Sequence, residues 1–485
     1  MGKWRYKKKS KMYTYRQRDE VDISAKSILE KEQDVQRTKD ANAENILSIV
    51  VPTSIFDKQK NKVIEEQIVK IDSGKKEPSE VAQGSIADNH EKGVEGEQFV
   101  NELTSKAYLK YWCYPNPIDE DGDKKEICDL LIAFFDTAII ISVKNYNNNG
   151  DYGRYKRKVV EKSTNQLFGA ERKLFKSNRN IKIKHPERGE FIFNSTNYKH
   201  LHRITINVGE QFEKYELIDT KENKGGINIL NKESFQAITD ELDTIKDLVE
   251  YISIREVLFL KNKEIQVHCS EKDLLAYYLM NNREFPQECF NGNFEEWSNS
   301  CVGKWETYLS NRSVLLKKLA DEKSYFIDEL IKNDVLPLEN GELLAKELMT
   351  LDRFDRRNIA SNLFEIVDKY QDIPDCLARR HYIINDILFL FIYYPPNKRE
   401  EEKNAILQKA QEIYAYKFRP NKVLLLAATN NMNQWKFGLF ETQKAEPTDK
   451  QKEYYDKMID SFGWFKDVQE IHKENKEYPD EVLFF

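Results

Sequence analysis

Asp129 and Lys144 are charged residues at the two ends of a pair of apolar runs. The runs, 128–135 and 138–143, are rich in β-branched residues and are separated by Asp-Thr, which predicts two adjacent buried strands joined by a tight turn. Side chains alternate along a strand, so Ser142 and Lys144 share one face. A carboxylate and a lysine brought to one sheet edge could hold a divalent metal ion beside a phosphodiester. A buried Asp–Lys ion pair that caps a hairpin explains the same residues equally well.

Two amphipathic segments flank these runs, and their apolar spacing predicts helices. Residues 93–107 form the first, and residues 156–176 form the second, which carries Gln166. The chain order is then helix, strand, strand with Asp129, strand ending in Lys144, helix with Gln166. We therefore expect Asp129 and Lys144 to approach each other at one edge of a mixed sheet, with Gln166 facing them from the flanking helix.

This order of elements resembles the PD-(D/E)xK, or restriction-endonuclease-like, nuclease superfamily over roughly residues 93–208. The segments YPNP (114–117), KEICDLL (125–131) and KSTNQLFGAER (162–172) are similar to segments of a prophage- or defence-type bacterial family with this core. The resemblance implies an α/β fold in which helices flank a mixed central sheet. It also implies Mg²⁺- or Mn²⁺-dependent hydrolysis of phosphodiester bonds, with DNA as the expected partner.

The resemblance assigns a role to each residue of the pattern. Asp129 becomes the metal-binding acid, Lys144 the catalytic lysine and Gln166 the support from the helix. In such a site the metal ion lowers the pKa of a bound water and neutralises charge on the phosphate. Lys144 would orient that water or stabilise the negative charge of the transition state.

The second carboxylate and the residue before the lysine are less regular. Glu97, in the Gly-Glu pair of the first helix, is the acid that the resemblance favours, while periodicity leaves Glu95 and Glu102 open. Ser142 stands where the superfamily usually has Asp or Glu. The implied metal ligands are then Asp129, Glu97 and Ser142, and a hydroxyl is a weaker ligand for a hard cation than a carboxylate.

Basic residues gather in the sequence around the second helix and could bind a phosphate backbone. A run of charge is usually a solvated face, but this one falls beside the candidate phosphodiester site, which favours a role in binding. The candidates are Arg154, Lys156, Arg157, Lys158, Lys162, Arg172 and Lys173. The first eighteen residues are also basic and aromatic, which suits a nucleic-acid-binding arm, although a solvated terminus explains this composition slightly better.

Three functions fit these observations. The first is a Mg²⁺-dependent endonuclease that acts on DNA in bacterial antiviral defence or in a mobile element. The second is a nuclease fold that has lost catalysis and serves as a DNA-binding or assembly module, which Ser142 supports. The third is a structural interaction protein, which the C-terminal half supports. The sequence contains no Walker A loop, dinucleotide fingerprint, HExxH or GxSxG motif, so the enzyme classes that depend on them are not indicated.

Composition predicts packed domains with a very polar surface. The chain has 485 residues, of which 33% are charged and 40% hydrophobic, and its net charge of -6 leaves room for local basic patches. Its six cysteines form no CxxC pair and predict reduced thiols in a cytoplasmic protein. The apolar run 387–394 is far shorter than the ~20 residues that span a bilayer, so no membrane association is expected.

Changes in composition divide the chain into three regions. Residues 1–90 combine the basic arm, a small helical and strand region and a polar linker. Residues 91–270 are the expected nuclease-like domain. Residues 271–485 are expected to be a mainly α-helical C-terminal domain with one short strand pair, at 423–428 and 435–441. This last region shows no readable chemistry, so we expect it to select substrate, bind a partner protein or form a homo-oligomer.

Overall fold

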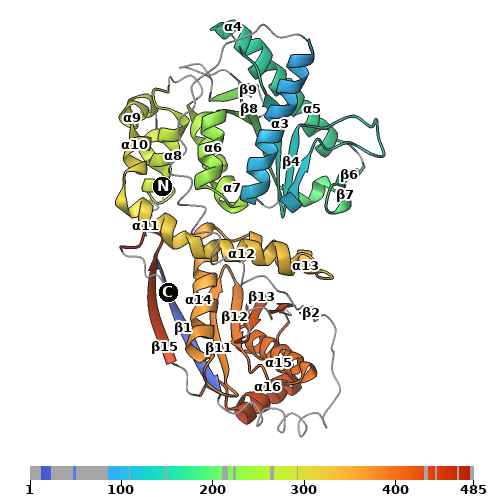
Figure 1. The fold of residues 1–485 in the computed structure, drawn as a ribbon, viewed down its shortest axis with the longest axis vertical. Coiled ribbons are helices and arrows are strands. Elements are labelled where there is room, and N and C mark those ends of the chain that lie inside the picture. Colours follow the sequence, from blue (N-terminus) through green and yellow to red (C-terminus); the bar gives the residue numbers. More distant parts are fainter. Residues whose placement is uncertain are drawn as a thin grey trace. The chain divides into compact units, whose positions relative to one another are not determined.

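The computed structural model divides the chain into two compact units, each of which is described separately. Unit 1 comprises Met1–Ser79, Lys317–Leu348 and Phe354–Phe485, and unit 2 comprises Glu80–Leu316 and Met349–Arg353. The structure describes residues 12–22, 47–50, 86–108, 110–147, 150–177, 179–209, 217–221, 225–262, 267–291, 293–430, 435–442, 445–466 and 469–480. Both units are drawn in Figure 1, and each combines helices with a β-sheet.

Unit 2 is built on a six-stranded mixed sheet with the order β3-β4-β5-β8-β10-β9. Strands β3, β4 and β5 are antiparallel neighbours, whereas β5, β8 and β10 run parallel. This sheet confirms the predicted α/β class with a mixed central sheet. The strands are β3 (Cys113–Pro115), β4 (Leu130–Phe134), β5 (Thr137–Lys144), β8 (His200–Asn207), β9 (Ile218–Lys221) and β10 (Gly225–Asn231).

The β4–β5 hairpin brings the ends of the two predicted strands together. Phe134 pairs with Thr137 across a two-residue turn, and Phe135 in that turn has a φ of 52°. The pairing continues to Leu130 opposite Ile141. Since the register is fixed, the residue before Leu130 lies at the same end of the sheet as the last residues of β5.

Two helices cover opposite faces of this sheet (Figure 1). Helix α3 (Ile86–Tyr108) comes so close at Gly96 that a Cβ there would lie 2.7 Å from Val208 Cγ2 and 3.5 Å from Val143 Cγ1. Helix α5 (Lys162–Phe175) packs Leu167 and other apolar residues against Ile140. Val143 and Ile140 are three residues apart on one strand and so point to opposite faces.

The remaining elements of unit 2 surround this core. A hairpin lies between α5 and β8, and the predicted second helix begins as a π-helix before it becomes α5. The helices are α4 (Tyr152–Tyr155), the π-helix η4 (Lys156–Glu161), α6 (Lys232–Glu241), α7 (Ile245–Lys261), α8 (Glu271–Met280), α9 (Phe294–Ser300) and α10 (Lys304–Leu309). The hairpin is β6 (Ile181–His185) and β7 (Gly189–Phe193), and short 3₁₀ turns lie at Lys110–Trp112, Ser195–Asn197 and Gln287–Phe290.

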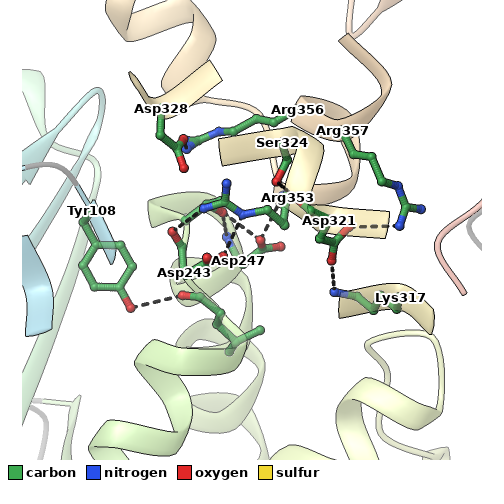
Figure 2. Close-up of polar contacts among 12 residues, drawn as sticks. Tyr108, Asp243, Asp247, Lys317, Asp321, Ser324, Asp328, Arg353, Arg356 and Arg357 are labelled. Carbon is green, nitrogen blue, oxygen red and sulfur yellow. Dashed lines mark hydrogen bonds and ion pairs between the residues drawn. The ribbon is translucent and has the colours of Figure 1, made fainter. Parts of the chain in front are cut away.

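Buried ion pairs fix these helices to the sheet of unit 2. The side chains of Arg255 in α7 and Glu271 in α8 are both fully buried and lie 2.7 Å apart, and Arg255 also donates to Asn228 in β10. The short segment 349–353 belongs to the same unit because the Arg353 guanidinium donates to Asp243 over 2.8 Å (Figure 2). Buried charges of this kind are tolerated only when each has partners.

Unit 1 contains a seven-stranded sheet with the order β15-β1-β11-β12-β13-β14-β2. Figure 1 shows β1, in blue, between β15 and β11. Strands β1 and β11, β11 and β12, and β13 and β14 are antiparallel pairs, while β12 and β13 are parallel. The strands are β1 (Met12–Asp22), β2 (Leu47–Val50), β11 (Leu377–Ile384), β12 (Ile387–Tyr393), β13 (Lys422–Ala428), β14 (Lys436–Glu441) and β15 (Gln469–Lys476).

The helices of unit 1 are mostly longer than its strands. Within it, Asp321 accepts hydrogen bonds from Lys317 over 2.6 Å and from Arg357 over 2.9 Å, which joins two helices (Figure 2). The chain passes from unit 2 into unit 1 within α11 (Arg312–Asp321). The others are α12 (Tyr325–Leu330), the π-helix η8 (Ile331–Val335), α13 (Gly341–Met349), α14 (Arg353–Tyr370), α15 (Glu400–Phe418), α16 (Asp449–Phe462) and the 3₁₀ turn Glu322–Ser324.

The structure differs from the predicted domain division in two ways. The chain leaves unit 2 at Leu316 rather than near residue 270, because α8, α9 and α10 belong to that unit. The predicted strand pair exists as β13 and β14, but it is part of the larger sheet, which also includes β1 and β2 from the N-terminal region. Residues 1–11 of the expected arm and most of the expected linker, 73–85, lie outside the described residues.

Within the described part of the chain, no helix combines the length and the apolar character needed to cross a membrane.

Candidate active site

The carboxylate of Asp129 is held against the last residues of β5. Its Oδ2 accepts a short hydrogen bond from the backbone N–H of Val143. The Ser142 hydroxyl lies 3.2 Å from the same oxygen, and the Lys144 ammonium lies 3.6 Å from it. The structure therefore brings Asp129 and Lys144 together at one end of the sheet, as the sequence pattern predicts.

Ser142 links the other groups of the site. Its side chain is buried, and its Oγ accepts a hydrogen bond from Lys144 Nζ over 2.8 Å. The same Oγ lies 3.4 Å from Oε1 of Gln166, so its one proton is shared between the Asp129 and Gln166 oxygens. These contacts engage the hydroxyl fully. Ser142 thus acts in this structure as a bridge rather than as the metal ligand that the resemblance implies.

Lys144 is enclosed rather than free in solvent. Its side chain is 13% exposed, and Nζ also donates to the Val143 carbonyl over 2.8 Å. Burial lowers the pKa of this ammonium below its ordinary value, and the positive charge of Lys162 acts in the same direction. The carboxylates of Asp129 and Glu97 oppose that shift. In the structure, the ammonium of Lys144 therefore faces the oxygens of Ser142, Val143 and Asp129.

Glu97 is the glutamate of α3 whose charge acts on this site. The close packing of Gly96 against Val208 carries Glu97 to the end of the sheet, where its Oε2 accepts from Asn116 over 3.3 Å. Glu95 and Glu102 are exposed, and Glu102 accepts from Gln98 one turn away on the same helix. The structure therefore favours Glu97 among the three candidates.

Glu126 is a further acid of the site, and the sequence analysis does not identify it. The residue as a whole is exposed, yet the pKa of its carboxyl group is raised from 4.5 to about 7. Desolvation is the largest cause, followed by the charges of Asp129 and Glu97 and by a hydrogen bond with Asp129, while Lys144 acts in the opposite direction. Glu126 precedes Asp129 by three residues in KEICDLL, but an irregular segment has no period that would reveal their proximity.

A pocket of about 420 Å³ is lined by Asp129, Ser142 and Glu126, but not by Lys144 or Glu97. Gln166 and Lys173 line it from α5. Its other lining residues are Asp123, Lys125, Ile127, Cys128, Leu167, Gly169 and Ala170. The pocket is therefore lined by both acidic and basic side chains and has room for a small polar group.

The acids of this site suit a loosely held magnesium ion. Among the described residues, no group of three or more His, Cys, Asp or Glu side chains is placed to hold a metal ion. Mg²⁺ usually keeps several waters and takes only one or two carboxylates together with substrate phosphates. Asp129 with either Glu126 or Glu97, and the carbonyl of Val143, match that donor set. After desolvation, the charges of Asp129 and Glu97 contribute to the raised pKa of Glu126, and a divalent cation relieves repulsion of this kind.

The predicted phosphate-binding residues divide into two groups. Most of them are exposed on α4, the π-helix and α5: Arg154, Lys156, Arg157, Lys158, Lys162 and Arg172. Lys173 is different, because it lies 2.5 Å from Asp123 and donates to the Lys125 carbonyl. Its charge therefore holds the loop before Glu126 in place, and the exposed group is the better candidate for contact with a phosphate backbone.

Comparisons of this chain with family models, with curated proteins and with solved structures found no match.

The raised pKa of Glu126 predicts a pH-dependent stability that its removal should abolish. Between pH 4.5 and about 7 the folded protein holds a proton that the unfolded chain has released, so stability falls as pH rises through this range. Glu126→Gln removes the charge and should raise the melting temperature at pH 8 relative to the wild type, but not at pH 4.

Calorimetric melting of both proteins from pH 4 to pH 8 measures this difference. Glu102→Gln, on the exposed side of α3, is the matched control and should track the wild type at each pH. A Glu126→Gln difference that does not change with pH would show that the pKa of the Glu126 carboxyl group is not raised in the folded protein.

Proposed function

We propose that this chain is a metal-dependent nuclease that hydrolyses phosphodiester bonds in DNA. The observation that carries the proposal is the contact between Asp129 and Lys144, at the point where β4 begins and β5 ends. Gln166 faces this point from α5. The element order supports it too, since α3, three antiparallel strands, α5 and the parallel strand β8 follow one another as in the superfamily that the sequence resembles.

Each residue of the site has a role in this proposal. Asp129, with Glu126 or Glu97 and the Val143 carbonyl, would hold a Mg²⁺ or Mn²⁺ ion, which when bound acidifies a water and neutralises phosphate charge. Lys144 leaves its contact with Asp129 and donates to an oxygen of the scissile phosphate, where negative charge increases in the transition state. Ser142 positions Lys144 by accepting a hydrogen bond from its ammonium, and Gln166 in turn contacts the Ser142 hydroxyl.

The surroundings support DNA as the substrate. The π-helix and α5 carry exposed cations, and one of them, Lys162, is close enough to act on the pKa of Lys144. Contacts of this kind neutralise phosphates without reading sequence. The six cysteines are free and buried, which supports action in the cytoplasm. A role in antiviral defence or in a mobile element belongs to the same proposal, as does a partner protein or a second copy of the chain.

A second candidate function is a DNA-binding or assembly module without catalysis. It is favoured by the closed contacts of Lys144, which donates to Ser142 and to the Val143 carbonyl. The absence of a three-acid group among the described residues favours it as well. This candidate predicts salt-dependent DNA binding without cleavage.

Removal of Lys144 tests the proposed function. Lys144→Ala should reduce Mg²⁺-dependent cleavage of plasmid DNA by about a hundredfold or more, since a preorganised donor to the transition state is lost. Its melting temperature should fall, because Lys144 compensates the charge of Asp129, but the protein should stay folded at the assay temperature. Its affinity for DNA should be nearly unchanged. Parallel reactions with EDTA establish the metal dependence.

Lys110→Ala is a suitable control, because Lys110 pairs with Glu187 on the surface away from the pocket lining. It should cut at the parental rate. Cleavage by Lys144→Ala at that same rate, or the lack of any cleavage by the wild type across plasmid, single-stranded DNA and RNA, contradicts the proposed function.

An acid at position 142 provides an independent test. Ser142→Asp places a carboxylate beside Asp129, so it should tighten Mn²⁺ binding in a calorimetric titration and keep or raise cleavage. Ser142→Ala is the matched control, which removes the bridge to Lys144 without adding charge. If Ser142→Asp binds Mn²⁺ no better than the wild type and only lowers the melting temperature, the acids at this sheet edge do not form a metal site.

A further inference from the structure

The central strands of unit 1 repeat the arrangement that builds the site in unit 2. Strands β11 and β12 form a hairpin with a two-residue turn, as β4 and β5 do. Helix α15 then crosses to β13, which runs parallel to β12, just as α5 precedes β8 alongside β5. In both units a further strand pairs antiparallel with the first hairpin strand, β1 in unit 1 and β3 in unit 2.

The registers of the two hairpins can be matched residue by residue from their turns. Phe134 pairs with Thr137 in unit 2, and Ile384 pairs with Ile387 in unit 1. In both units the parallel ladder begins at the first residue after the turn, at Thr137 and at Ile387. A constant offset of 250 residues therefore relates the two hairpins.

This offset also preserves which face of the sheet each residue occupies. In unit 2, Ala138 and Ile140 lie on the side of α5. Their counterparts in unit 1, Leu388 and Leu390, share an apolar cluster with residues of α15. On the other face, Arg380 donates to Glu365 of α14, which occupies the place that α3 has in unit 2. The two units thus share strand order, register and the sides of their helices.

The offset assigns a counterpart to each central residue of the candidate site. Asp129 corresponds to Arg379, Ser142 to Ile392 and Lys144 to Tyr394. None of the three counterparts is an acid or an amine that could reproduce the site, since Arg379 carries the opposite charge to Asp129 and Ile392 has no polar group.

Packing also closes the corresponding position in unit 1. The Arg379 guanidinium lies 4.1 Å from the ring centroid of Trp464, and Arg379 is 3% exposed. Ile392, Tyr394 and Trp464 are members of one buried apolar cluster. In unit 2 the equivalent end of the sheet opens into a pocket lined by Asp129 and Ser142.

We infer that unit 1 contains a second copy of the unit 2 core whose site position is sealed and catalytically silent. The chain then has a single catalytic centre, at Asp129 and Lys144. This consequence rests on the proposed nuclease function. One centre breaks one strand at each encounter, so a chain that acts alone nicks a duplex before it cuts both strands.

The sealed position can be tested whether or not the chain cuts DNA. Ile392→Ser introduces at the unit 1 position the residue that unit 2 has there. In a sealed core it should lower the melting temperature by about 5 °C or more, because a large buried side chain is lost, and should leave Mn²⁺ titrations unchanged. Ser142→Ala should lower the melting temperature by less. An Ile392→Ser protein that melts like the wild type contradicts the sealed position.

Plasmid cleavage tests the single centre. In Mg²⁺, supercoiled plasmid should become open circular before it becomes linear, Asp129→Asn should remove all cleavage, and Tyr394→Phe should cut at the parental rate. Cleavage that survives Asp129→Asn and disappears on the further change Tyr394→Phe would show a live second centre and overturn the inference. A wild type that cuts nothing refutes the proposed function instead, and the melting experiment still decides the sealed position.

Discussion

The hydrogen bond from the Val143 amide to the Asp129 carboxylate is the contact on which the candidate site depends. It fixes the residue that leads into β4 against the last residues of β5. Ser142 and Lys144 then reach the same carboxylate because they alternate with Val143 along the strand. The contact also places a negative charge where Glu126 and Glu97 already act. Without this hydrogen bond, the Asp129 carboxylate would not be held beside Ser142 and Lys144.

The electrostatics of this sheet end explain both the cost of placing these acids together and their proposed role. The charges of Asp129, Glu97 and Glu126 act on one another and on the partly buried Lys144, so full ionisation of these acids is unfavourable without a compensating cation. In this structure Lys144 supplies the compensating charge, with Ser142 holding it in place. A divalent cation and a phosphate could take over that compensation and release Lys144 toward the substrate. Under the proposed function, the same residues would serve stability in the free protein and chemistry when DNA is bound.

The sequence predicts much of unit 2 because its signals there are periodic. The apolar runs around Asp136 identify β4 and β5, and strand alternation places Ser142 and Lys144 on one face. The sequence does not predict that Glu126 belongs to the site, because this residue lies in an irregular segment, where contacts depend on the tertiary path of the chain. The sequence does not predict the sheet of unit 1 for another reason. Strand β11 carries two adjacent arginines, a pattern typical of a surface segment. In the structure, however, Arg379 packs on Trp464 and Arg380 pairs with Glu365 in the interior. Its partner strand β12 is apolar on both faces, a pattern that does not distinguish a buried strand from a buried helix.

The most direct test of this account is to locate a metal ion in the protein. Crystals of the full chain grown with Mn²⁺ and measured at a wavelength where manganese scatters anomalously would show the ion as a peak in the anomalous map. The expected result is a peak in contact with Asp129 and a second acid, Glu126 or Glu97, with the Lys144 ammonium displaced from Asp129. A map without a peak at this sheet end, with Lys144 still paired to Asp129 at millimolar Mn²⁺, would contradict it.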